Sequence, residues 1–211
     1  DWYAPTHVVF GKETESEVSS LLKESKCSRV LLHYGSGSVI HSGLLDRIKA
    51  SLAEASIEYV ELGGVVANPR LSHVYKGIDI AKSNEIDFIL AVGGGSVIDS
   101  AKAIAYGAVA DFDVWDIYDR KRTPQSALPV GVVLTIAAAG SEMSNSSVIT
   151  NEDGGIKRGY SNNLARPRFA ILNPELTMTL PDYQTACGCI DIMMHTMERY
   201  FTSAGNMELT D

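Results

Sequence analysis

A glycine triplet, Gly93-Gly94-Gly95, separates two segments of different hydrophobic pattern. The apolar run 88–92 before it predicts a short buried strand, and the apolar residues at helical spacing after it predict a helix. A strand, a glycine turn and a helix in this order direct backbone N–H groups and the positive end of a helix dipole at one point, where a phosphate can bind. A tight turn that merely requires positive φ would use the same residues, so the triplet alone leaves both interpretations open.

A carboxylate and an imidazole, Asp191 and His195, stand four residues apart within a predicted helix over 182–202. This spacing places them on one helical face, where both could reach a common divalent ion, and Glu198 follows one turn later. A surface ion pair or a buried, hydrogen-bonded histidine is the commoner explanation of such a pair. Catalytic zinc usually has three protein ligands, so a metal here needs ligands from elsewhere. For Cys187-Gly188-Cys189, packing of small residues at the helix start is favoured over a metal clamp.

These residues lie on a chain in which predicted strands and helices alternate. Such alternation with short connections indicates an α/β fold with a parallel sheet covered by helices. A β-hairpin is expected around Glu152-Asp153-Gly154, and Thr14 and Asp182 are expected to cap helices. The predicted strands are 7–11, 29–34, 57–62, 88–92, 128–136 and 169–172, and the predicted helices are 14–23, 43–55, 71–83, 97–105 and 182–202.

A second turn of small residues, Gly35-Ser36-Gly37-Ser38, follows the predicted strand 29–34. Ligands of open α/β sheets bind beyond the carboxyl ends of the strands, so two strands ending in glycine-serine turns predict a nucleotide cleft. The spacing does not match G-x-G-x-x-G, which favours a dinucleotide-binding domain of another topology.

Composition excludes several classes of partner. The 211 residues are 45% hydrophobic and 21% charged, as in an ordinary globular protein, and the net charge of −8 argues against nucleic acid and anionic membranes. No apolar run approaches the roughly 20 residues that span a bilayer, and three cysteines cannot form a disulfide framework. We expect a cytoplasmic protein.

Five motifs in order carry a resemblance to a known family. The chain resembles the iron-containing (group III) alcohol dehydrogenases, and within them the NADPH-dependent butanol dehydrogenase and aldehyde reductase branch. The motifs are Pro5-Thr6…Phe10-Gly11, Gly93 to Lys102, Leu134-Thr135…Gly140-Ser141-Glu142, Asn173-Pro174…Leu180-Pro181 and Asp191-x-x-x-His195-x-x-Glu198-x-Tyr200.

The resemblance implies two domains and a homodimer. Residues 1–180 would form an α/β dinucleotide-binding domain of the dehydroquinate synthase-like kind, and residues 181–211 would begin an all-helical metal-binding domain that is truncated after its first helix. Family members use two further histidine ligands, which this sequence does not contain.

The resemblance also implies the site residues. Asp191 and His195 would hold Fe²⁺ or Zn²⁺, and an alcohol or aldehyde would be the small-molecule substrate. The positions implied for binding NAD(P)H are Gly35, Ser36, Gly37, Ser38, Gly94, Gly95, Ser96, Asp99, Thr135, Ser144 and Lys157.

The implied reaction is hydride transfer between the nicotinamide and a primary alcohol or aldehyde held on the metal. A glycerol dehydrogenase, another dehydroquinate synthase-like enzyme and a non-catalytic cofactor-binding fragment stay open as alternatives. We expect NADPH over NADH, because no Asp or Glu follows the strand 29–34 before Asp46, and a carboxylate there would repel a 2′-phosphate.

Overall fold

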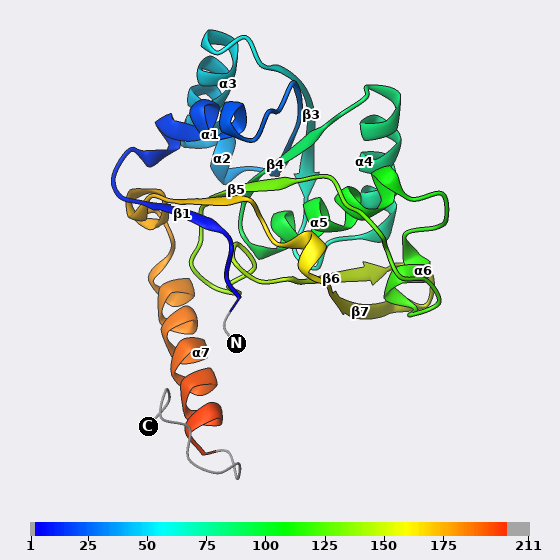
Figure 1. Cartoon of the computed structure of the whole chain (residues 1–211). Helices are drawn as coiled ribbons and strands as arrows, with labels where there is room; N and C mark the ends of the chain where they lie inside the picture. The colour runs from blue at the N-terminus through cyan, green and yellow to red at the C-terminus, as the bar shows by residue number, and fades with distance from the viewer. Residues whose placement is uncertain (1–2, 202–211) are drawn as a thin grey trace.

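A six-stranded parallel sheet is the centre of the computed structural model, which describes residues 3–201 (Figure 1). The strand order is β1-β8-β5-β4-β2-β3. This confirms the predicted α/β fold. The sheet strands are β1 (His7–Phe10), β2 (Arg29–Gly35), β3 (Glu58–Val65), β4 (Phe88–Gly93), β5 (Val130–Leu134) and β8 (Phe169–Leu172); β6 (Ser146–Asn151) and β7 (Ile156–Ser161) form a separate antiparallel hairpin.

Helices cover both faces of the sheet. The face that carries Ile89 and Ala91 packs against α4 and α5, and the face that carries Leu90 and Val92 packs against α1 and α3, because side chains of a strand alternate between faces. The helices are α1 (Val18–Glu24), α2 (Ser38–His41), α3 (Leu44–Glu54), α4 (Leu71–Ser83), α5 (Gly95–Val109), α6 (Trp115–Tyr118) and α7 (Asp182–Tyr200), and short 3-10 helices are η1 (Thr14–Glu17), η2 (Asp153–Gly155), η3 (Asn163–Ala165) and η4 (Pro174–Thr177).

Two predicted helix caps are wrong. The predicted helix 14–23 is divided into η1 and α1, and the Thr14 hydroxyl donates to the Gly11 carbonyl at 2.9 Å, so Thr14 caps no helix. Asp182 is the first residue of α7, and Pro181 takes the N-cap position. The predicted end of that helix, at Thr202, lies outside the described residues.

A topological switch point lies between the neighbouring strands β2 and β4. The chain leaves β2 toward α3 on one face of the sheet and leaves β4 into α5 on the other face. The two connections therefore diverge, and a crevice opens beyond the carboxyl ends of these strands. The two glycine-serine turns predicted to bind a ligand follow β2 and β4.

His33 is the most deeply enclosed titratable group of the sheet, with no exposed surface. Its Nδ1 lies 2.9 Å from the Leu62 carbonyl oxygen, which can only accept, so Nδ1 carries the proton. Its Nε2 then accepts from the Ser100 hydroxyl at 3.0 Å. Burial, helped by the nearby His73, lowers the pKa of His33 to about 3. A neutral histidine thus joins β2, β3 and α5.

The helix α7 leaves the body of the molecule (Figure 1). None of its 19 residues is buried, and it carries exposed apolar side chains such as Ile192 and Met194. None of the helices within residues 3–201 is both long enough and apolar enough to cross a membrane.

Candidate functional site

A cleft of about 1090 Å³ opens at the switch point. Gly35 at the end of β2, Gly93 at the end of β4, Gly94 after it, and Thr135 after β5 all line the cleft. The cleft therefore lies beyond the carboxyl ends of three adjacent strands, where the sequence predicts a nucleotide.

The glycine turn brings the start of α5 to this cleft. Gly94 is the N-cap residue of α5, and its carbonyl accepts from the N–H groups of Val97 at 3.0 Å and Ile98 at 3.2 Å. A glycine cap offers no side-chain oxygen to the first N–H groups of the helix, which leaves them available to an anion.

Steric contact is what requires glycine at position 94. Gly94 has φ −93° and ψ −169°, which any residue can adopt, so a positive φ does not explain glycine at this position. Within the triplet the positive φ, +158°, belongs to Gly93. A Cβ at Gly94 would lie 2.4 Å from Cγ2 of Ile136, and one at Gly95 would lie 3.1 Å from Cβ of Ala139. The segment after β5 therefore packs in direct contact with the glycine turn.

The turn after β2 contributes a second wall. Gly35 and Ser38 line the cleft, and Ser36 and Gly37 join them between β2 and α2. Gly37 is the N-cap residue of α2. All four residues are small, so this wall leaves room for a ligand beside the glycine turn.

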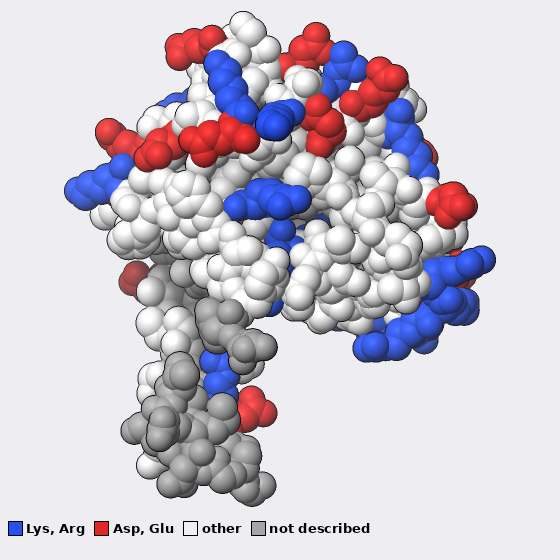
Figure 2. All heavy atoms as spheres, viewed as in Figure 1, with Lys and Arg blue, Asp and Glu red and all other residues white. Residues whose placement is uncertain are grey.

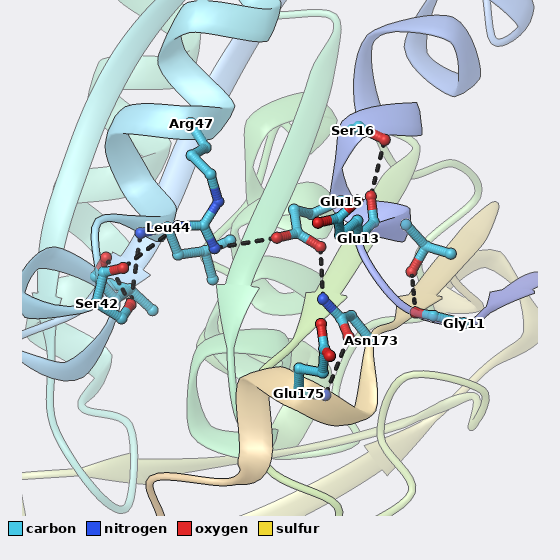
Figure 3. A network of polar contacts seen from close by, with 11 residues as sticks. Gly11, Glu13, Glu15, Ser16, Ser42, Leu44, Arg47, Asn173 and Glu175 are labelled. Carbon is cyan, nitrogen blue, oxygen red and sulfur yellow. Dashed lines mark hydrogen bonds and ion pairs between the residues drawn. The ribbon is translucent and has the colours of Figure 1, made fainter.

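The far end of the cleft holds a polar network that the sequence did not predict (Figure 3). The Glu15 carboxylate, only 7% exposed, accepts from Asn173 Nδ2 at 2.8 Å and from Arg47 Nη2 at 3.0 Å. Burial alone would raise the pKa of Glu15, but these donors hold it below its ordinary value. Because 158 residues separate Glu15 from Asn173, no local pattern could have revealed the pair.

Carboxylates dominate the lining at this end of the cleft. The lining residues include one cationic side chain, Arg47, and four glutamates, which are Glu13, Glu15, Glu54 and Glu175. Acidic and basic side chains are mixed over the upper part of the visible face (Figure 2), and the chain as a whole has a net charge of −8, so the excess of acid in the cleft has the same sign as that of the whole protein.

Asp99 and Lys102 on α5 contact the loop that joins β5 to β6. Asp99 accepts from the Ser141 hydroxyl at 2.6 Å and from the Val148 N–H at 3.0 Å. Lys102 has no exposed surface, and its ammonium donates to the carbonyls of Ser141 at 2.8 Å, Ser144 at 2.9 Å and Ser146 at 2.8 Å.

Burial moves both pKa values toward the neutral forms. It raises the pKa of Asp99, and it lowers the pKa of Lys102 to about 8. A signal for the burial of Lys102 was present in the sequence, because the other residues of 101–109 carry no charge and are apolar on every side of the helix, and a charge within such a segment must be enclosed.

Three further residues predicted to bind the cofactor have different surroundings. Thr135 lines the cleft. Ser144 lies on the β5–β6 loop, where its carbonyl contacts Lys102. Lys157 on β7 donates to the Asn68 side chain at 2.7 Å, so the hairpin contacts the connection between β3 and α4. The structure therefore brings Lys157 and Asn68 together across 89 residues.

The helix α7 carries the two predicted metal ligands on one face. His195 Nε2 lies 3.7 Å from Asp191 Oδ2, and His195 Nδ1 lies 3.8 Å from Glu198 Oε2. The side chains of Asp191 and His195 are 60% and 63% exposed. Within residues 3–201 no group of three His, Cys, Asp or Glu side chains is arranged to hold a metal ion. An oxygen and a nitrogen donor suit Fe²⁺ or Zn²⁺, but only as part of a larger ligand set.

Comparison with known proteins shows a consistent relationship. Residues 5–174 match the family model described as iron-containing alcohol dehydrogenase. The chain is 48% identical over its whole length to a probable NADH-dependent butanol dehydrogenase 2 of Bacillus subtilis and 34% identical over 99% of its length to the NADPH-dependent aldehyde reductase YqhD of Escherichia coli. Each match covers 54% of the relative.

Solved structures agree with the sequence comparison. The crystal structure of an NADH-dependent butanol dehydrogenase A from Thermotoga maritima superposes with a TM-score of 0.95 at 39% identity, over all of this chain and 54% of that one. The chain thus spans about half the length of the relatives it matches.

Proposed function

Because the chain belongs to the iron-containing alcohol dehydrogenase family, we propose that it supplies the nucleotide-binding part of an oxidoreductase. The reaction is hydride transfer between NAD(P)H and a primary alcohol or aldehyde. The observation that carries the proposal is the uncapped start of α5, which opens into the cleft at the switch point between β2 and β4.

Different residues of the chain bind different parts of the dinucleotide. Gly94, Gly95 and Ser96 hold the pyrophosphate with the first N–H groups of α5, and the turn from Gly35 to Ser38 lies beside the adenine ribose. Thr135 contributes a hydroxyl to the cleft, and Asp99, Ser144 and Lys157 complete the set from the elements around it.

Asp191 and His195 would hold the divalent metal, Fe²⁺ or Zn²⁺. Their carboxylate oxygen and imidazole nitrogen fit such an ion as two members of a ligand set. Lewis acidity toward the carbonyl oxygen of the substrate is the chemistry that the bound ion supplies. Asp191 would contribute negative charge and His195 a neutral nitrogen.

We assign residues 1–180 to the dinucleotide-binding domain and residues 181–211 to the start of the metal-binding domain, of which 202–211 lie outside the described residues.

We also propose NADPH in preference to NADH, since no acid occupies the turn from Gly35 to Ser38. The names of the relatives are divided on this point, with NADH in the butanol dehydrogenases and NADPH in the aldehyde reductase. A homodimer and a cytoplasmic location stay predictions, and sedimentation of the purified protein tests the first.

A charge-reversal experiment tests the nucleotide site. Ser96→Glu places a carboxylate in the first turn of α5, where acids stabilise a helix but repel phosphate. We expect micromolar binding of NAD(P)H by the wild type, followed by nucleotide fluorescence, and at least tenfold weaker binding by Ser96→Glu with an unchanged melting temperature. Gln184→Glu, the same substitution type in the first turn of α7, should bind like the wild type. Absence of saturable binding by the wild type would exclude the proposed function.

A further inference from the structure

We propose that Lys102 and Asp99 are positioning residues that fix the loop 136–148 as a wall of the nucleotide site. This inference rests on the proposed function for the identity of the ligand. It assigns Lys102 a role that the sequence pattern did not suggest.

The loop contacts the glycine turn and the first two turns of α5 at several points. Its start contacts the glycine turn, since Ile136 and Ala139 occupy the space where Gly94 and Gly95 would carry a Cβ. Its middle is bound to Asp99 through the hydroxyl of Ser141. The same loop also reaches α7, because the Ala137 carbonyl lies 3.6 Å from the position of a Cβ on Gly188. The loop therefore lies between the glycine turn and the helix that carries Asp191.

Lys102 holds the loop by a complete set of hydrogen bonds. An ammonium group has three donors, and three backbone carbonyls of one short segment accept from it at 2.8 to 2.9 Å. The hydroxyls of Ser141 and Ser144 lie further away, at 3.1 and 3.4 Å. These carbonyls converge only because the segment folds around the ammonium group. Without it, buried carbonyl oxygens would lose their partners, and the segment would have to rearrange to expose them to water.

Asp99 holds the other end of the same loop. Its two carboxylate oxygens accept from the hydroxyl of Ser141 and from the N–H of Val148, which lies in β6. Because Asp99 and Lys102 are three residues apart on α5, they face the loop together. The charged groups that face Lys102 from the neighbouring segments are Asp99, Glu142 and Arg166, and Lys157 faces Asp99.

The protonation state of Lys102 supports this role. Burial lowers the pKa of Lys102 to about 8. The carboxylates of Asp99 and Glu142 act against this shift, and the charge of Arg166 adds to it. The neutral amine donates only two hydrogen bonds, so one carbonyl loses its donor above that pH. The loop should loosen as the pH rises.

Lys102→Met tests the inference, because it keeps the length of the side chain and removes the donors. Lys82→Met is the matched control, since Lys82 also donates to a backbone carbonyl, that of Ala110, but on the exposed surface of α4. For the wild type and both variants we would measure NADPH affinity from pH 6.5 to 9, and amide hydrogen exchange over 136–148 without nucleotide.

We expect Lys102→Met to bind NADPH at least tenfold more weakly at pH 7 and to exchange amides of 136–148 at least tenfold faster. Wild-type affinity should fall above pH 8, and that fall should be missing in the variant, which a general loss of stability would not produce. Lys82→Met should match the wild type throughout. Unchanged affinity or unchanged exchange in a folded Lys102→Met protein would overturn the proposal.

Ser141→Ala covers the case in which Lys102→Met does not fold. It removes the hydroxyl that donates to Asp99 and that accepts from Lys102 at 3.1 Å, and it leaves the three carbonyl contacts of Lys102 in place. We expect faster exchange over 136–148 and about threefold weaker binding, and wild-type behaviour would overturn the proposal. If the wild type binds no nucleotide, the proposed function fails, whereas the exchange measurement still decides whether Lys102 fixes the loop.

Discussion

The side-chain amide of Asn173 donates a 2.8 Å hydrogen bond to the carboxylate of Glu15, which ties the end of β8 to the 3-10 helix η1 across 158 residues of sequence. Arg47 on α3 donates to the same carboxylate at 3.0 Å. Three segments that are far apart in the chain therefore meet at one buried anion, and they form the far end of the cleft (Figure 3).

Glu15→Ala should lower the free energy of unfolding by about 1–3 kcal/mol, because Asn173 and Arg47 lose the acceptor that they share. Urea denaturation at pH 7 measures the change. Glu17→Ala, on an exposed position of the same 3-10 helix, should change it little.

The contribution of Glu15 should also depend on pH. Its folded-state pKa is held below the unfolded value, so its stabilisation is present above the unfolded pKa and is lost as the pH falls through the folded pKa. The difference in stability between wild type and Glu15→Gln should therefore shrink on acidification below about pH 4.5. A difference that is independent of pH would show that the carboxylate charge does not matter.

His33 should make the protein sensitive to mild acid. Its folded-state pKa of about 3 lies below the ordinary histidine value, so the stabilisation is present above about pH 6.5 and is lost as the pH falls toward 3. The free energy of unfolding should fall by up to ~1.4 kcal/mol per pH unit in that window. His33→Leu should be less stable at pH 7.5 but flatter between pH 6.5 and 5, whereas His7→Gln on the exposed strand β1 should keep the wild-type slope.

Gly94→Ala should weaken NAD(P)H binding. A double variant distinguishes a collision with Ile136 from a blocked approach of the pyrophosphate to the backbone. The added methyl collides with Ile136, whose Cγ2 would lie 2.4 Å away. If the loss of binding comes only from that collision, Gly94→Ala combined with Ile136→Ala should restore wild-type affinity. We expect no restoration, because the backbone of the turn must approach the pyrophosphate closely. Recovery in the double variant would assign a purely structural role to Gly94.

Ser36→Asp should shift nucleotide preference from NADPH toward NADH. A carboxylate beside the adenine ribose would repel a 2′-phosphate and accept from a 2′-hydroxyl. Paired affinity measurements on wild type and variant test this, with Ser20→Asp on the exposed surface of α1 as the charge control. Equal affinities of the wild type for the two nucleotides, or no shift in the variant, would show that this turn does not contact the ribose.

The 211-residue chain alone should bind Zn²⁺ weakly and show no alcohol oxidation above background. Asp191 and His195 provide two exposed ligands from one helix, which can neither enclose an ion nor orient a substrate. Calorimetric titration should show a loss of the weak binding in His195→Ala and wild-type binding in Asp182→Asn. Robust metal-dependent turnover by these residues would contradict the assignment of the ligands.

The elements of the fold could be predicted because their signals are local. The apolar run before the glycine triplet and the helical spacing after it correspond to β4 and α5, and α4 begins and ends at the predicted residues. The site was predicted as far as backbone geometry determines it, since strand ends and glycine turns are visible in sequence.

The sequence could not predict which distant segments the side chains contact. The pattern predicts Lys102 only as one residue of a helix. Its three carbonyl partners lie about 40 residues further along, in a loop whose sequence has no periodicity to indicate the contact. Similarly, Asn173-Pro174 stands in the sequence only as part of a family motif after the predicted strand 169–172, and the contact of Asn173 with Glu15 depends on the order of strands in the finished sheet.

The position of β1 in the sheet has a consequence for the way the chain reaches its native state. His7 pairs with Phe169 and Phe10 pairs with Leu172, so β1 can pair only after β8 has been synthesised. Pairings between such distant segments form slowly, because a long loop must close before any contact compensates for the lost entropy. Folding should therefore begin with β2, β3 and β4, whose pairings span shorter loops, and end with the insertion of β8 between β5 and β1. Until then, the edge of β5 is open, and its unpaired backbone groups can pair with another chain.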